Sequence, residues 1–141
     1  MTTDWGELRR VVENRFQAQW ASTTPVKWDG VPFIEPAGRA WVALYLLDGA
    51  SSQISLETTP RYRDVGVVVN QIFVPQDGGT QEARRLAALA AAVWRGWTAA
   101  VGATGWLWLR APSLSRVGES AGWLQYNVSC GYRLDRKPWA S

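Results

Sequence analysis

The last long stretch of the chain, residues 123–135, alternates between apolar and polar positions. Its even-numbered positions hold Leu, Tyr, Val, Cys, Tyr and Leu, whereas its odd-numbered positions are mostly polar. Successive side chains of a strand point to opposite faces, so this pattern predicts a long strand with one buried and one mostly wet face. Such strands are typical of antiparallel sheets. We expect it to be a central strand against which the rest of the chain packs.

Two other segments carry apolar residues at helical spacing. Residues 4–21 predict an amphipathic helix, and Asp4 followed three residues later by Glu7 fits a capping box at its start. Residues 81–101 predict a second helix, with Thr80 as its N-cap. The many alanines of this helix allow a close approach to whatever lies beneath it, which suits a helix lying on a sheet.

The remaining apolar runs are strand-like and are separated by turn residues. Because strands come in groups and helices do not alternate with them, the order predicts an α+β fold in a single domain, residues 1–141. We expect one mainly antiparallel β-sheet with two α-helices packed on one face. The first predicted pieces are an extended segment at 26–29, a strand at 40–47, a turn at 48–52, a hairpin partner at 53–58 and a strand at 61–74. The strand at 40–47 is buried either on both faces or on one face plus an assembly contact. A further strand is predicted at 106–112, residues 113–119 either extend it or form a separate short strand, and the tail at 136–141 is loose apart from Trp139.

Composition agrees with a globular chain, since 47% of its residues are hydrophobic and 19% are charged. Ten tryptophans exceed what a core of this size needs, which places some of them at a contact surface. The net charge of +3 is spread along the sequence and gives no clustered footprint for nucleic acid. The N-terminal residues do not form a signal peptide, and no uncharged stretch is long enough to cross a bilayer, so no membrane partner is expected.

The chain contains no histidine, which removes Ser-His-acid and Cys-His catalysis and most metal sites. Its one cysteine, Cys130, lies on the inward side of the last predicted strand, where a buried apolar role is favoured. The carboxylates are scattered, and those beside predicted strands, Glu35, Glu57 and Asp64, form no recognisable catalytic pair. We therefore expect no enzyme activity, cofactor or metal.

Three short motifs have functional interpretations that their context does not favour. Residues 118–122, GESAG, match the nucleophile elbow, but no histidine exists and a predicted strand follows, so a turn is favoured. Residues 102–105, GATG, match a KH loop, but they precede a strand and carry no basic residue, so a helix-ending turn is favoured. Residues 77–80, DGGT, precede a helix whose N-terminus could hold an anion, but they lack the lysine of a phosphate-binding loop, so a nucleotide site is not favoured.

What remains is a surface suited to contact. The segment from residue 53 to 63 mixes apolar and basic residues beside a long strand, and it is either an ordinary hairpin with a solvated tip or an edge that meets a neighbouring subunit. Three outward-facing tryptophans, at positions 106, 108 and 123, also need partners, either under the helices or at a subunit interface. The candidate oligomer-interface residues are Gln53, Ile54, Leu56, Arg61, Tyr62 and Arg63.

The chain as a whole resembles the tail terminator proteins of long-tailed bacteriophages. The resemblance is carried by LRRVVENRFQAQW near the start, VKWDGVPFIEP, the run RYRDVGVVVNQIFVPQDGGTQEARRLAALAAAVW and the closing strand WLQYNVSCGYRLD. These motifs are patterns of apolar residues, proline and glycine without a shared reactive residue. They cover nearly the whole chain.

The resemblance implies a small structural subunit that forms a ring, commonly six-fold, at the head-proximal end of the tail tube. Such a ring stops tube polymerisation and offers a surface for joining the head. The implied partners are further copies of the chain, the major tail tube protein and a head–tail connector protein, and DNA passes through the lumen without specific binding. The implied location is the virion tail, assembled in the cytoplasm of the host bacterium.

Other functions remain open at this stage. A different head–tail connector or neck protein of similar fold would share these patterns. A single-stranded nucleic-acid binder could use tryptophan and arginine side chains as stacking platforms. An enzyme that relies on carboxylates alone has no positive sign in the sequence.

Overall fold

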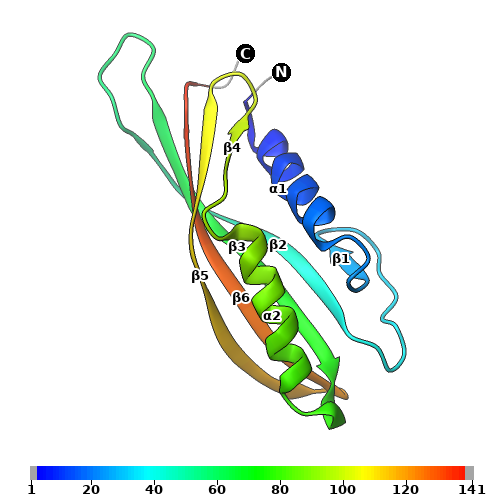
Figure 1. Ribbon diagram of the computed structural model, residues 1–141. Coiled ribbons are helices and arrows are strands. Elements are labelled where there is room, and N and C mark those ends of the chain that lie inside the picture. Colours follow the sequence, from blue (N-terminus) through cyan, green and yellow to red (C-terminus); the bar gives the residue numbers. More distant parts are fainter. Residues whose placement is uncertain (1–2, 139–141) are drawn as a thin grey trace.

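The computed structural model describes residues 3–138 as an α+β fold with two α-helices and one curled sheet of six strands (Figure 1). The strand order across the sheet is β1-β2-β3-β6-β5-β4. Strands β1 and β2 pair in parallel, whereas the other neighbours pair antiparallel, so the sheet is mainly antiparallel, as predicted, but mixed. The elements are α1 (Trp5–Trp20), β1 (Val26–Trp28), β2 (Trp41–Gln53), β3 (Tyr62–Pro75), a 3-10 turn η1 (Gln76–Gly78), α2 (Gln81–Trp94), β4 (Thr98–Val101), β5 (Gly105–Ser120) and β6 (Trp123–Arg136).

Strand β6 is central, as its alternation predicts, because it lies between β3 and β5. Both helices supply side chains to the same core cluster as β6. Phe16 of α1 stacks between Trp20 and Trp94, with ring centroids 5.1 and 5.8 Å away. That the helices cover a single face stays a prediction, which this shared core supports. The even-numbered positions of β6 from 124 to 134 are each at most 2% exposed: Leu124, Tyr126, Val128, Cys130, Tyr132 and Leu134.

Helix α1 begins and ends within one residue of its predicted bounds. Asp4 is its N-cap, and the side-chain oxygen Oδ1 accepts a hydrogen bond from the backbone N–H of Glu7 at 2.7 Å. This bond satisfies one of the amide groups that have no partner inside the helix. Leu8, Val12, Phe16 and Trp20 form the buried stripe that the periodicity predicts.

Helix α2 is shorter than predicted, because it ends at Trp94 and not near residue 101. Gly96 adopts a positive φ of 70°, which ends the helix, and Trp97 folds back so that its N–H bonds the carbonyl of Trp94 at 3.0 Å. The alanines after Gly96 lie in strand β4. Residues 102–104 therefore form the turn between β4 and β5, and the helix-ending turn predicted at 102–105 is wrong. Thr80 occupies the N-cap position of α2, but its side chain makes no capping hydrogen bond.

The predicted turn at 48–52 and the predicted strand at 53–58 are both wrong. Strand β2 continues to Gln53 through a bulge between Asp48 and Ser51, and the loop to β3 spans residues 54–61. Gly49 is needed for close approach, since a Cβ there would lie 2.6 Å from the carbonyl oxygen of Val65. Asp48 and Gly49, a residue pair typical of turns, thus lie at a bulge within the strand.

The predicted strand at 106–112 and its possible extension form one strand, β5, with two bulges against β6. The following turn is centred on Ala121 and Gly122, whose φ angles are 52° and 86°. Two consecutive positive φ values are typical of the tight type I′ hairpin turn. The GESAG motif therefore lies at the end of a strand and in a hairpin turn, as expected, and makes no nucleophile elbow.

Gly66 of β3 lies opposite Tyr132 of β6, and the tyrosine ring covers it. A Cβ at this position would lie 2.5 Å from the ring and closer still to the carbonyl oxygen of Leu47.

Replacement of Gly66 by alanine is expected to lower the free energy of unfolding by about 1–3 kcal/mol, because a packed sheet must shift to admit the methyl group. Urea unfolding measures this effect. The matched control is Gly78→Ala, where nothing lies within 4 Å of the added Cβ. Equal stability of the two variants would contradict the prediction.

Candidate functional site

The outer half of the β2–β3 hairpin is exposed to solvent. Residues 47–54 are all exposed, and in Figure 1 this part of the hairpin extends away from both helices. The loop at its end, residues 54–61, is called the tip below. Leu56 of the tip is 98% exposed and Ile54 is 39% exposed. Large apolar side chains that face water on a projecting loop are suited to contact with another protein.

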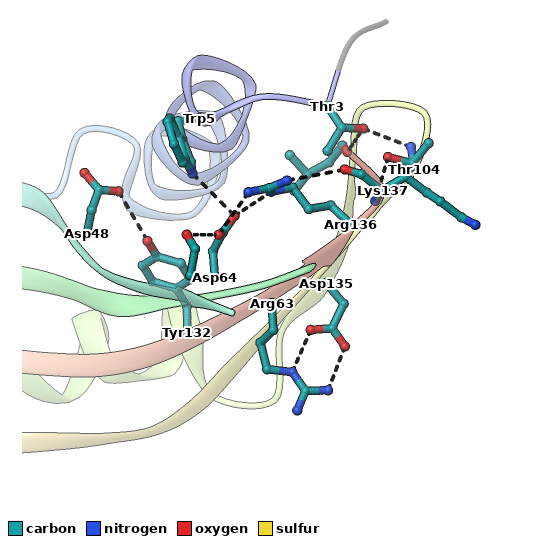
Figure 2. Close-up of polar contacts among 12 residues, drawn as sticks. Thr3, Trp5, Asp48, Arg63, Asp64, Thr104, Tyr132, Asp135, Arg136 and Lys137 are labelled. Carbon is teal, nitrogen blue, oxygen red and sulfur yellow. Dashed lines mark hydrogen bonds and ion pairs between the residues drawn. The ribbon is translucent and has the colours of Figure 1, made fainter. Parts of the chain in front are cut away.

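A buried ion pair fixes the base of the hairpin to the end of β6 (Figure 2). The guanidinium of Arg136 donates to the carboxylate of Asp64 through Nε at 2.7 Å and Nη2 at 3.2 Å. These residues are only 5% and 3% exposed. The hydroxyl of Ser51 and the indole Nε1 of Trp5, the latter at 3.3 Å, donate to the same carboxylate. Residues of α1, β2, β3 and β6 therefore meet at one carboxylate.

A second bidentate pair lies on the opposite face of the same two strands, as Figure 2 shows. Arg63 donates to Asp135 through Nε at 2.8 Å and Nη2 at 3.0 Å. The hydrogen bond from Arg63 holds the pKa of Asp135 below its ordinary value, and the same bond raises the pKa of Arg63. Since the folded pKa of Asp135 is depressed, its contribution to stability is present above the ordinary carboxyl range. That contribution is lost as the pH falls through the lowered pKa.

The tip has a defined conformation held by hydrogen bonds. The backbone N–H of Ile54 donates to the carbonyl of Arg61 at 2.9 Å, and the N–H of Arg61 donates to Oγ of Ser55 at 2.9 Å. From the C-terminal side, Nζ of Lys137 donates to Glu57 at 3.3 Å and to the carbonyl of Thr59 at 3.4 Å. These contacts leave the side chain of Leu56 in solvent.

The six candidate interface residues fall into two groups. Gln53, Ile54 and Leu56 lie at the end of β2 and in the tip, and all three are exposed. Tyr62 and Arg63 begin β3 and are half-buried, because Arg136 lies 5.4 Å from the ring of Tyr62 and Arg63 is paired with Asp135. Arg61, also half-buried, joins the tip to β3. The exposed group is available for contact with a partner, whereas Tyr62 and Arg63 also hold the base of the hairpin.

The outward-facing tryptophans find partners within the chain. Trp123 packs edge-on against Trp41, with centroids 6.0 Å apart, and its Nε1 donates to Glu35 at 3.2 Å. Arg133 lies over the ring of Trp108 at 4.1 Å, and Trp108 in turn meets Trp106 at 6.5 Å. All of these contacts are made within one chain, and a contact of these tryptophans with a neighbouring subunit stays a prediction. Trp106 keeps an exposed fraction of 41%.

Sequence reasoning missed the buried pair at the base of the hairpin. Residues 136–141 are expected to be loose, but Arg136 is the last residue of β6 and is buried. Trp139 lies outside the described residues. Asp64 flanks a predicted strand, and no local pattern links it to an arginine 72 residues away. One signal could have found Arg136: it follows the buried even-numbered positions of β6 at the same two-residue spacing.

The described residues contain no cluster that suits a metal ion. Burial raises the pKa of Cys130 to about 11, and its thiol lies 2.9 Å from the carbonyl oxygen of Arg110, so the thiol stays protonated at neutral pH. Between residues 3 and 138 no three His, Cys, Asp or Glu side chains come together as metal ligands. Neither described helix has the length and hydropathy that a membrane crossing requires.

Comparisons with known proteins identify the class and then the family. The chain is a structural protein of the bacteriophage tail, because a family model described as "Phage tail terminator protein" matches residues 7–132. The chain belongs to the phage tail terminator protein family, as the resemblance in its sequence implies. It is therefore a component of the virion tail.

One solved structure gives an independent view of the fold. It superposes with a TM-score of 0.71 at 21% sequence identity, over 93% of this chain and 95% of that one. At this identity the likeness concerns the fold alone, and the name of that protein states no function. No curated protein sequence matches the chain.

Proposed function

We propose that the protein forms a ring of six copies at the head-proximal end of the tail tube, stops polymerisation of the tube and provides the surface that joins the head. The family match over residues 7–132 is the observation that carries this proposal. The projecting hairpin supports it, because its exposed tip offers each copy a contact for a neighbour. The other partners are the major tail tube protein and a connector protein, and DNA passes through the lumen without specific binding.

The proposed role is structural and uses no reactive side chain. Within residues 3–138, Cys130 is buried and the carboxylates Asp64 and Asp135 are paired with arginines. A ring that ends a tube works through shape, since each copy must bind the last tube subunit and offer no further tube-binding surface. Assembly of the subunits takes place in the cytoplasm of the host bacterium under this proposal.

Deletion of the gene in the phage is expected to give tails that exceed the normal length, because tube growth then lacks its terminator. Electron microscopy of the lysate measures tail length directly. Expression of the intact gene from a plasmid is the control and should restore normal length. Tails of normal length that fail to join heads would contradict a terminator and would instead assign the chain to another connector or neck protein of similar fold.

A further inference from the structure

A groove lies between α2 and strand β5, on the side of α2 that faces away from α1 (Figure 1). Its volume is about 210 Å³. Its wall on α2 repeats at helical spacing, so that Arg84, Ala88, Ala91 and Arg95 form one stripe. The other lining residues are Ala87, Pro112, Ser113, Leu114 and Val128.

Arg84 and Arg95 line this groove, Arg116 shares the ring of Tyr126 with Arg84, and none of the three is neutralised by a described residue. Arg84, Arg95 and Arg116 are exposed and form no ion pair within residues 3–138. Arg84 and Arg116 both lie over the buried ring of Tyr126, with guanidinium carbons 5.6 and 6.0 Å from its centroid. The ring attracts each cation, but the two cations repel each other. A carboxylate placed beside them would relieve that repulsion.

The groove therefore fits a short segment that carries an apolar side chain next to an acidic one. The apolar side chain would lie against the alanines of α2 and Leu114, which is 42% exposed. The acidic side chain would lie near Arg84 and Arg116. The chain itself exposes such a segment at the tip, where Leu56, 98% exposed, is followed by Glu57.

The tip of one chain cannot reach the groove of the same chain. The base of the hairpin pairs with Arg136 at the end of β6, whereas the groove lies at Val128 in the middle of that strand. Eight residues of strand separate these positions by roughly 26 Å, and the tip projects farther away (Figure 1). An occupant of the groove with this sequence must come from a second copy.

We infer that the tip of one copy docks into the α2–β5 groove of the next, with Leu56 on the alanines and Glu57 beside Arg84 and Arg116. This inference rests on the proposed function, since it names the contact that joins neighbours in the ring. Glu57 is free to exchange partners, because its pair with Lys137 is exposed and such pairs contribute little. The two surfaces differ, so the contact runs head to tail and generates a closed ring or a filament.

One substitution in each surface tests the docking: an acidic group replaces the apolar Leu56 of the tip, and the charge of Arg84 in the groove is reversed. Leu56→Asp and Arg84→Glu are each expected to weaken self-association by about 30-fold, as central contact residues do. Light scattering after gel filtration, over a wide range of protein concentration, measures the oligomer. The double variant Glu57→Arg with Arg84→Glu should restore assembly, because the charges are then exchanged. An equal mixture of the two single variants should give a dimer, since one supplies an intact groove and the other an intact tip.

Ile34→Asp is the matched control, because Ile34 is 92% exposed, precedes Glu35 and lies outside both surfaces. Its assembly should equal that of the wild type. Rings that persist in Arg84→Glu would overturn the docking and leave the proposed ring intact. Loss of assembly in Ile34→Asp but not in Leu56→Asp would also overturn it. A wild-type chain that stays monomeric throughout would overturn the docking, whereas tail length in the deletion phage would still decide the proposed function.

Discussion

Replacement of Arg136 by methionine is expected to lower the free energy of unfolding by about 3–5 kcal/mol. The methionine keeps much of the buried apolar stem but removes both donors to Asp64, which is 3% exposed. The carboxylate then keeps only the neutral donors of Ser51 and Trp5. An ionised group that is buried without a counter-ion is costly, so most of the loss comes from the partner that remains.

Chemical denaturation followed by tryptophan fluorescence measures this change. The control is Arg39→Met, because Arg39 is exposed and its replacement should stay within about 0.5 kcal/mol of the wild type. Hydrogen exchange adds a local readout, since amides of residues 51–53 should exchange faster when the base of the hairpin loosens. A stability of Arg136→Met close to that of Arg39→Met would show that the buried pair does not hold the hairpin.

Replacement of Trp94 by alanine is expected to cost about 4 kcal/mol or more. The side chain is fully buried, stacks on Phe16 and meets Trp97 at 5.9 Å, so its removal leaves a large cavity worth about 3–5 kcal/mol. The indole Nε1 also donates to Oδ1 of Asn70 at 2.8 Å. Asn70 is fully buried, and loss of this donor leaves its side chain without a partner, which adds about 1–3 kcal/mol.

A further variant separates the cavity from the hydrogen bond. Trp94→Phe keeps an aromatic ring but removes the donor, so it should lose less than the alanine variant while still leaving Asn70 unsatisfied. Leu89→Ala on the same helix is the control, because Leu89 is 42% exposed and its removal opens no cavity. Since a domain is stable by about 5–15 kcal/mol, Trp94→Ala should be close to unfolding at moderate temperature. Similar unfolding midpoints for Trp94→Ala and Leu89→Ala would contradict this account.

The elements that the sequence predicts correctly are those whose signal is local and periodic. Strand β6 follows from strict alternation over residues 123–135, and α1 follows from a capping residue and four apolar positions at helical spacing. The predicted end of α2 is wrong. The alanines in residues 98–101 favour a helix in the sequence, and only the structure shows that Gly96 adopts a positive φ and ends it. Asp48 and Gly49 are typical of turns, and only pairing with β3 shows that they lie in a bulge.

The candidate site was predictable in part. A mixed apolar and basic segment beside a long strand identifies the hairpin, and Leu56 proves to be exposed as an interface residue requires. The roles of Tyr62 and Arg63 at the base depend on residues 135 and 136, which are distant in sequence. The groove depends on α2, β5 and β6 together, so no spacing within one element reveals it.

The pairing of β3 with β6 affects how the chain folds during synthesis. The two central strands are residues 62–75 and 123–136, so the middle of the sheet joins segments that are far apart in the chain. On the ribosome, β2 and β3 can form a hairpin early, but its inner edge stays open until the last strand emerges. Long-range pairings of this kind form slowly, and open strand edges are prone to aggregate. A slow final step of synthesis would therefore lengthen the interval in which nascent subunits are vulnerable.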